Sequence, residues 1–87
     1  MKINGIEFKI NKIEPNSRVD CFMGRCDSMN GTITINKDLP QDVADKTLIH
    51  ECIHAILDMG GFDEESGNDS LVCCLENGLY SLGIRLI

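Results

Sequence analysis

Residues Thr47–Leu57 read TLIHECIHAIL, a mostly apolar run that carries two histidines and a glutamate in its middle. In a helix, which turns about 100° per residue, His50, Glu51 and His54 fall within about a quarter-turn of one another. Asp58 joins the same sector one turn later. The remaining positions of the run are mostly apolar, so the stretch predicts a helix that is buried except along one polar strip.

The signals around this run set the length of the helix. Upstream, Asp38 is a candidate N-cap, Pro40 suits the first turn, and Gln41 lies three residues after the cap. Downstream, the pair Gly60 and Gly61 is typical of a helix end. These signals predict a helix of about 20 residues.

Before this helix the sequence predicts three strands. Residues 3–10 alternate apolar and polar side chains, and residues 19–25 and 32–36 have the composition of two further strands. Asn30 and Gly31 predict a turn between the second and third strands. We expect a small antiparallel sheet, in which the first strand places three side chains on one face: Ile6, Phe8 and Ile10.

After a polar turn, the sequence predicts a last helix from about Asp69 to Leu82. Its expected apolar stripe comprises Leu71, Val72, Leu75, Leu79 and Leu82. The order of strands followed by two helices predicts an α+β fold with both helices on one face of the sheet. At 87 residues, we expect residues 1–87 to form a single domain.

Composition excludes several classes of partner. The net charge is −6 and no cluster of lysine and arginine is present, which argues against nucleic acid or an anionic membrane as the main partner. No apolar run reaches the roughly 18 residues of a membrane span, and residues 1–10 lack the apolar core of a secretory signal. We therefore expect a cytoplasmic protein.

The five cysteines also favour a reducing compartment. They are Cys21, Cys26, Cys52, Cys73 and Cys74, an odd number with two adjacent. This pattern fits buried free thiols better than a disulfide framework. A metal-binding pair of Cys21 and Cys26 is the less favoured alternative.

The histidines of the central helix have the spacing of metal ligands. His50 and His54 are the only two histidines of the chain, and the i, i+4 spacing places both imidazoles on one side of the helix. Glu51 lies beside them, where its carboxylate can contact a water on the metal. The residues predict a zinc site with Glu51 as general base, whereas the competing interpretation is a chance pair of hydrogen-bonded histidines.

In this motif the sequence resembles the zincin metallopeptidases, specifically small phage-borne members of the ImmA/IrrE-like and SprT-like groups. The resemblance covers roughly residues 26–82. It implies a minimal zincin-like fold in which His50 and His54 bind zinc, Glu51 is the general base and a later helix supplies a third ligand. It also implies a strand that lies antiparallel to the substrate along the cleft, for which residues 32–36 are the counterpart.

The third ligand has two main candidates. The stretch NDSLVCCL, residues 68–75, is similar to the part of the zincin pattern that carries this ligand and assigns it to Asp69, which is otherwise a helix N-cap. Glu76 is the alternative, because it lies two helical turns from Asp69 on the same face and is the only charged residue between Ser70 and Ile84.

Three further residues receive lesser roles. Cys73 and Asp58 remain as other ligands, although Asp58 is better interpreted as a hydrogen-bond acceptor for a ligand histidine. Tyr80 could donate a hydrogen bond to a developing oxyanion, but packing is the favoured interpretation.

The leading functional hypothesis is a zinc-dependent metallopeptidase that acts on a protein or peptide substrate. The alternative is a non-catalytic binding module in which zinc is a structural staple and the sheet edge binds a host or phage protein. A fold with no metal ranks last. Glu51 separates the first two hypotheses, because a structural zinc site needs no base at that position.

Overall fold

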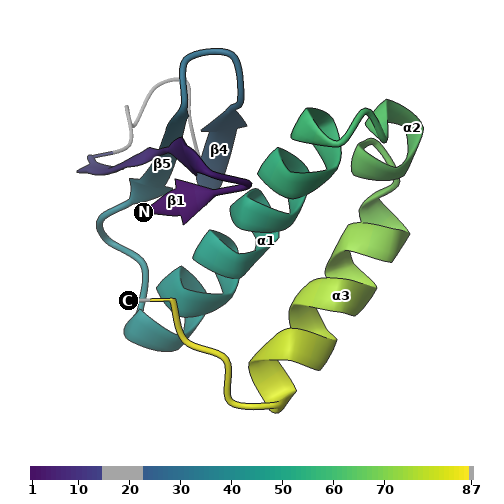
Figure 1. The fold of residues 1–87 in the computed structure, drawn as a ribbon. Coiled ribbons are helices and arrows are strands. Elements are labelled where there is room, and N and C mark those ends of the chain that lie inside the picture. The colour runs from purple at the N-terminus through teal and green to yellow at the C-terminus, as the bar shows by residue number, and fades with distance from the viewer. Residues whose placement is uncertain (15–22, 87) are drawn as a thin grey trace.

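The computed structural model describes residues 1–14 and 23–86 and confirms the α+β class (Figure 1). The strands come first along the chain and the helices follow, the longest helix having 19 residues. The elements are β1 (Lys2–Ile3), β2 (Ile6–Glu7), β3 (Lys9–Ile13), β4 (Gly24–Asp27), β5 (Thr32–Asn36), α1 (Gln41–Met59), α2 (Asp63–Ser66) and α3 (Asp69–Ser81).

The main sheet is mixed rather than antiparallel. Its strand order is β3-β5-β4, with β5 antiparallel to β4 and parallel to β3. The turn between β4 and β5 contains Asn30 and Gly31 as predicted, and Gly31 has a positive φ of 65°. The expected strand at 19–25 coincides with β4 only over Gly24 and Arg25, because residues 19–22 lie outside the described part. The prediction of an all-antiparallel sheet was wrong, because β5 returns between the two earlier strands.

The N-terminal strand is interrupted by a turn. Asn4 and Gly5 both have positive φ, 51° and 81°, which is the backbone of a tight hairpin turn, and the turn joins β1 to β2 as an antiparallel pair. The turn changes which side chains face inward. Ile3 and Phe8 are buried, whereas Ile6 is 53% exposed, so the predicted common face with Ile6 was wrong.

Helix α1 closely matches its predicted span, but its first turn is capped differently. Pro40 is the N-cap residue and offers no side-chain hydrogen bond, so Asp38 is not the cap. At the other end, Gly61 has a φ of 83°, and the Phe62 amide donates to the Leu57 carbonyl at 2.8 Å. This left-handed glycine and hydrogen bond form a Schellman-type end, as the glycine pair predicted.

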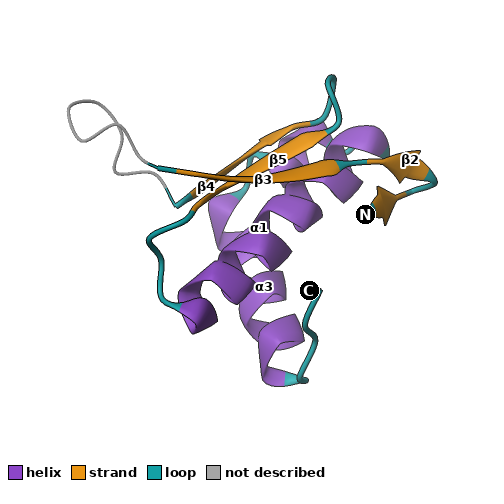
Figure 2. Ribbon diagram, turned by 90° about the vertical axis from the view of Figure 1, so that its left-hand side faces the viewer, coloured by secondary structure: helices purple, strands orange, loops and turns teal. Residues whose placement is uncertain are grey.

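Helix α1 lies between the sheet and α3 (Figure 2). One side of α1 packs on the sheet in a core cluster that comprises Ile3, Phe8, Ile33, Ile35, Leu48, Cys52 and Ala55. A different side packs on α3 in a smaller cluster of Ile49, Ile53 and Val72, flanked by Leu57 and Tyr80. Helix α3 contacts α1 and α2 but none of the described strands. The expectation that both helices pack on the sheet therefore holds for α1 alone.

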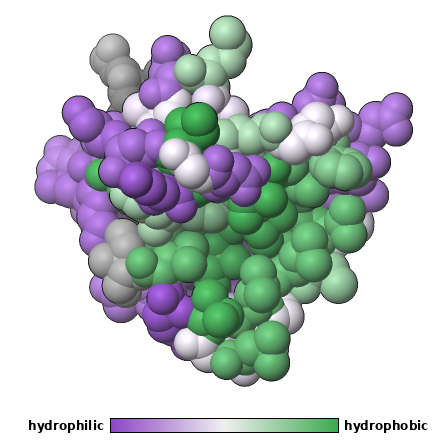
Figure 3. Space-filling view, viewed as in Figure 1, coloured by the Kyte–Doolittle hydropathy of each residue, from purple (hydrophilic) through white to green (hydrophobic). Residues whose placement is uncertain are grey.

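Helix α3 turns a partly polar face toward α1. Val72 is fully buried, and Glu76 and Tyr80, one and two turns later, are partly buried. The predicted leucine stripe is largely exposed, with Leu75 at 41%, Leu79 at 36% and Leu82 at 78%. Figure 3 shows apolar surface on the side of the molecule where Figure 1 places α3. Despite this surface, no helix in the described ranges has the length and apolar character needed to cross a membrane.

The four described cysteines are free thiols in two different settings. Cys52 is buried and Cys26 is half-buried, both at the core between α1 and the sheet, and burial raises the pKa of the Cys52 thiol to about 11. Cys73 and Cys74 are exposed on α3, so the expectation of burial was wrong for them. Cys21 lies outside the described residues.

Candidate metal site

The two imidazoles of α1 converge through their outer nitrogens. The Nε2 atoms of His50 and His54 lie 3.2 Å apart, and the ring centroids are 4.8 Å apart with the rings at 64°. Two nitrogens bound to one tetrahedral zinc, each about 2.05 Å from the metal, lie about 3.3 Å apart. The pair therefore has the spacing of two zinc ligands.

The inner nitrogens of both rings are held by hydrogen bonds. His50 Nδ1 lies 2.7 Å from Glu76 Oε1, and His54 Nδ1 lies 3.0 Å from Ser66 Oγ. A carboxylate or hydroxyl on the far ring nitrogen is the usual support of a metal-binding histidine, because it fixes the orientation of the ring. Helices α3 and α2 thus each supply one support for an α1 histidine.

These partners also determine where the protons lie. Glu76 accepts a hydrogen bond, so His50 carries its proton on Nδ1 and presents a lone pair on Nε2. His54 then donates from Nε2 to His50 and accepts from the Ser66 hydroxyl at Nδ1. Because a hydroxyl can donate or accept, Ser66 permits His54 to move its proton to Nδ1 when a metal replaces the proton at Nε2.

Glu51 lies on the same strip and is 8% exposed. No hydrogen bond from the described residues reaches its carboxylate. Burial raises the pKa of Glu51 above its ordinary value; the neighbouring His50 and His54 partly offset this rise, and the Glu76 carboxylate adds to it. A carboxylate with a raised pKa is a stronger base than an ordinary one, as a general base requires.

A cleft of about 450 Å³ opens in front of this strip. Its lining comes from the start of β4, from α1 and from α3, and comprises Met23, Gly24, Val43, Lys46, Thr47, His50, Glu51 and Glu76. Strand β4 is an edge strand of the described sheet, whereas β5 lies between β3 and β4. The strand beside the cleft is therefore β4, and the assignment of residues 32–36 to that role was wrong because both edges of β5 are paired.

Gly24 brings β4 close to the polar strip of α1. A Cβ atom at Gly24 would lie 2.6 Å from Thr47 Cγ2, 3.2 Å from Glu51 Cγ and 3.2 Å from the Thr34 carbonyl oxygen. The first of these distances is shorter than any ordinary carbon contact. Only glycine therefore permits the present distance between β4 and α1.

We expect Gly24→Ala to destabilise the fold by about 1–3 kcal/mol, the usual cost of overpacking, because β4 or α1 must move. Urea unfolding measures the change. Gly67→Ala is the matched control, since a Cβ there would meet only the Asp63 and Glu64 carbonyl oxygens at 3.6 Å, an ordinary contact. An equal loss in both variants would show that the close approach of β4 is not the cause.

The two predicted candidates for the third ligand lie in different places. Asp69 is exposed at the first residue of α3, and the side-chain cap of that helix is Asn68, which accepts from the Leu71 amide at 3.1 Å. Glu76 has a side-chain exposure of 16% and contacts His50. Within the described ranges, the one group of three ligand-type side chains is His50, Cys73 and Glu76, which does not include Asp69.

The structure also places the residues with lesser predicted roles. Asp58 accepts from the Ser28 hydroxyl at 3.0 Å, and the partner of His54 is Ser66 instead. Tyr80 packs against the cluster between α1 and α3, with the Arg85 guanidinium 3.8 Å and the Lys46 ammonium 5.6 Å from its ring centroid. Packing is thus the observed role of Tyr80.

No family model, curated protein or solved structure matches the chain. The resemblance to zincins therefore depends on the motif from His50 to His54, and it stays a prediction. The site geometry provides independent support for metal binding.

Proposed function

We propose that the protein is a zinc-dependent peptidase whose metal is held by His50 and His54. The observation that carries the proposal is the 3.2 Å separation of the two Nε2 atoms on a helix that also presents Glu51. Paired imidazoles with supported Nδ1 atoms are the nitrogen ligands that zinc prefers. The described residues bring two such ligands together. The proposal assigns the third to Glu76 of α3, whose carboxylate accepts from His50 Nδ1 in the structure and would have to move away from that nitrogen to bind the metal.

In this proposal the chemistry is divided between the metal and Glu51. Zinc bound at this site would activate a water and polarise the carbonyl of a peptide bond. Glu51 accepts the proton of the attacking water and passes it to the nitrogen of the leaving amine. The position of Glu51 supports this role, since the residue is only 8% exposed, lines the cleft and has no competing hydrogen bond within the described residues.

The cleft supplies room for an extended peptide. It runs between the start of β4 and the face of α3 that carries Glu76, with α1 as its floor. Met23 and Val43 provide apolar lining, and Lys46 adds a positive charge one helical turn before His50. These features support a short peptide segment as substrate rather than a large folded surface.

We expect Glu76→Ala to weaken zinc binding by about 10-fold or more, because removal of a ligand or of the support of a ligand histidine has at least this effect. Asp69→Ala should leave the affinity nearly unchanged, since Asp69 is exposed. Competition with a coloured chelator measures both affinities. The opposite order would return the third-ligand role to Asp69.

A zinc-stapled binding module is the alternative, and one observation favours it. His50 is joined to α3 through Glu76 and His54 to α2 through Ser66, so a metal on the two histidines would stabilise the packing of all three helices. In this alternative Glu51 has no chemical role, because a structural zinc site needs no general base. A direct test is to measure the zinc content of the purified protein and its cleavage of a mixed peptide library with and without ortho-phenanthroline. Zinc-loaded protein that cleaves nothing would favour the staple.

A further inference from the structure

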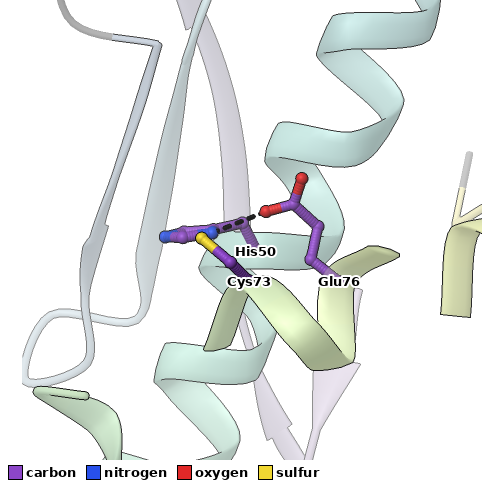
Figure 4. A group of neighbouring side chains, drawn as sticks. All are labelled: His50, Cys73 and Glu76. Carbon is purple, nitrogen blue, oxygen red and sulfur yellow. Dashed lines mark hydrogen bonds and ion pairs between the residues drawn. The ribbon is translucent and has the colours of Figure 1, made fainter. Parts of the chain in front are cut away.

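The second cluster of metal-ligand side chains lies on the α3 side of the His50 ring. Cys73 and Glu76 are three residues apart on α3 and reach toward His50 from the neighbouring helix (Figure 4). One ligand atom from each of the three residues lies within 4.8 Å of the others. The histidine nitrogen that faces Glu76 is Nδ1, which does not belong to the pair of Nε2 atoms described above.

We propose that His50, Cys73 and Glu76 form a second metal site for a thiophilic divalent cation such as Zn2+, Cd2+ or Co2+. A thiolate, an imidazole and a carboxylate are a donor set that such cations accept. Glu76 lies 2.7 Å from Nδ1, a hydrogen-bond distance that has to open to about 3.3 Å when a metal replaces the proton between the two atoms. Sulfur and nitrogen on one tetrahedral zinc lie about 3.6 Å apart, and the ligand atoms lie within 4.8 Å of one another, so the exposed Cys73 side chain needs a movement of at most about 1.2 Å to complete the site.

The two sites place opposite demands on His50. A metal at Nε2 requires the proton on Nδ1, which is the form that Glu76 stabilises, whereas a metal at Nδ1 moves the proton to Nε2. In that second form, Nε2 donates toward His54 and no longer offers a lone pair to a metal. The second site therefore competes with the first, and this competition, unlike the site itself, rests on the proposed function. A cation bound by Cys73 would inhibit the peptidase.

Cobalt titration tests the site without any need for activity. Co2+ bound to a thiolate gives a sulfur-to-cobalt charge-transfer absorption in the near ultraviolet, which we expect in the wild-type protein. Cys73→Ser should remove this absorption, or weaken the cobalt affinity of the site that gives it by about 10-fold or more, because the substitution deletes a ligand. Cys74→Ser is the matched control, since Cys74 is adjacent and also exposed, and it should keep the absorption.

His54→Ala distinguishes a second site from a contribution of Cys73 to the first. It should keep the absorption, because His54 does not belong to the second site. Loss of the absorption in both Cys73→Ser and His54→Ala would overturn the proposal and make Cys73 a ligand of the first site. An absorption unchanged in Cys73→Ser, or none in the wild type at millimolar cobalt, would also overturn it and leave Cys73 as a neighbour of the His50–Glu76 pair.

Circular dichroism of each variant checks the fold, and Cys73→Ala provides a second variant if the serine is poorly tolerated.

The outcome of the cobalt titration is independent of whether the protein is a peptidase. If cleavage is never detected but the absorption follows Cys73, the second site holds and the proposed function fails. If zinc binding and cleavage depend on His54, while cobalt binding and its absorption are the same with and without Cys73, the proposed function holds and the second site fails.

Discussion

Glu51→Gln is expected to lower the rate of peptide hydrolysis by about 10²- to 10⁴-fold, the usual effect of removing a general base, while the fold and the bound zinc are retained. Glutamine keeps the size of the side chain but cannot accept the proton of the attacking water. The burial that raises the pKa of Glu51 also makes its neutral replacement easy to accommodate, because glutamine brings no charge into the site.

The measurement compares new peptide termini in cells that express the wild type or the Glu51→Gln variant. Glu64→Gln, an exposed change of the same chemistry on α2, is the control and should behave as the wild type. Termini that appear with the wild type and the control but not with Glu51→Gln would support catalysis. Equal sets of termini in all three, with zinc bound, would contradict it and favour the binding module.

In a protein that also carries Cys73→Ser, which removes a ligand of the second proposed site, His54→Ala is expected to abolish the stabilisation of the protein by zinc. A ligand present at 100 times its Kd adds about 2.7 kcal/mol to the free energy of unfolding. For a domain of this size, that raises the melting temperature by roughly 10–20 °C. With one of the two converging nitrogens removed, we expect the melting temperature of the variant to be the same with and without zinc.

Each variant is compared with its own metal-free form. The loss of packing around His54 lowers both melting temperatures alike, so it does not affect their difference. Differential scanning calorimetry and elemental analysis supply the two readouts. A protein with both His54→Ala and Cys73→Ser that still binds one zinc, and that zinc stabilises as strongly as the protein with Cys73→Ser alone, would place the metal away from both proposed sites.

Much of the helical structure follows from local signals. The apolar periodicity and the glycine pair after Met59 predict α1, and the strip with His50, Glu51 and His54 follows from helix geometry alone. The turn at Gly31 was likewise predicted from a local signal, the adjacent pair Asn30 and Gly31. The Asn4–Gly5 pair carries the same turn signal and could have revealed the first hairpin, but the alternation of residues 3–10 was interpreted as one continuous strand.

The features of the fold and the site that the sequence did not predict depend on contacts between residues far apart in the chain. The parallel register of β3 on β5 joins Lys9 to Thr32, and no local pattern specifies such a pairing. Ser66 was missed as the partner of His54, because nothing in a single serine 12 residues downstream indicates that it reaches back to a histidine. The buried face of α3 was missed because Glu76 is drawn inward by His50, whereas hydrophobicity alone places the leucines inside.

The separation of the two core clusters has a consequence for how the molecule opens. Helix α3 adds Val72 as its only fully buried side chain and contacts no described strand, whereas α1 and the sheet share the larger cluster. Proteins open in cooperative units whose free energies follow such differences in burial. We therefore expect α3 to detach in a local unfolding event that leaves α1 and the sheet intact and removes Glu76 from His50. We expect the amide hydrogens of α3 to exchange with solvent through this opening, and a cation held between α1 and α3 to slow that exchange.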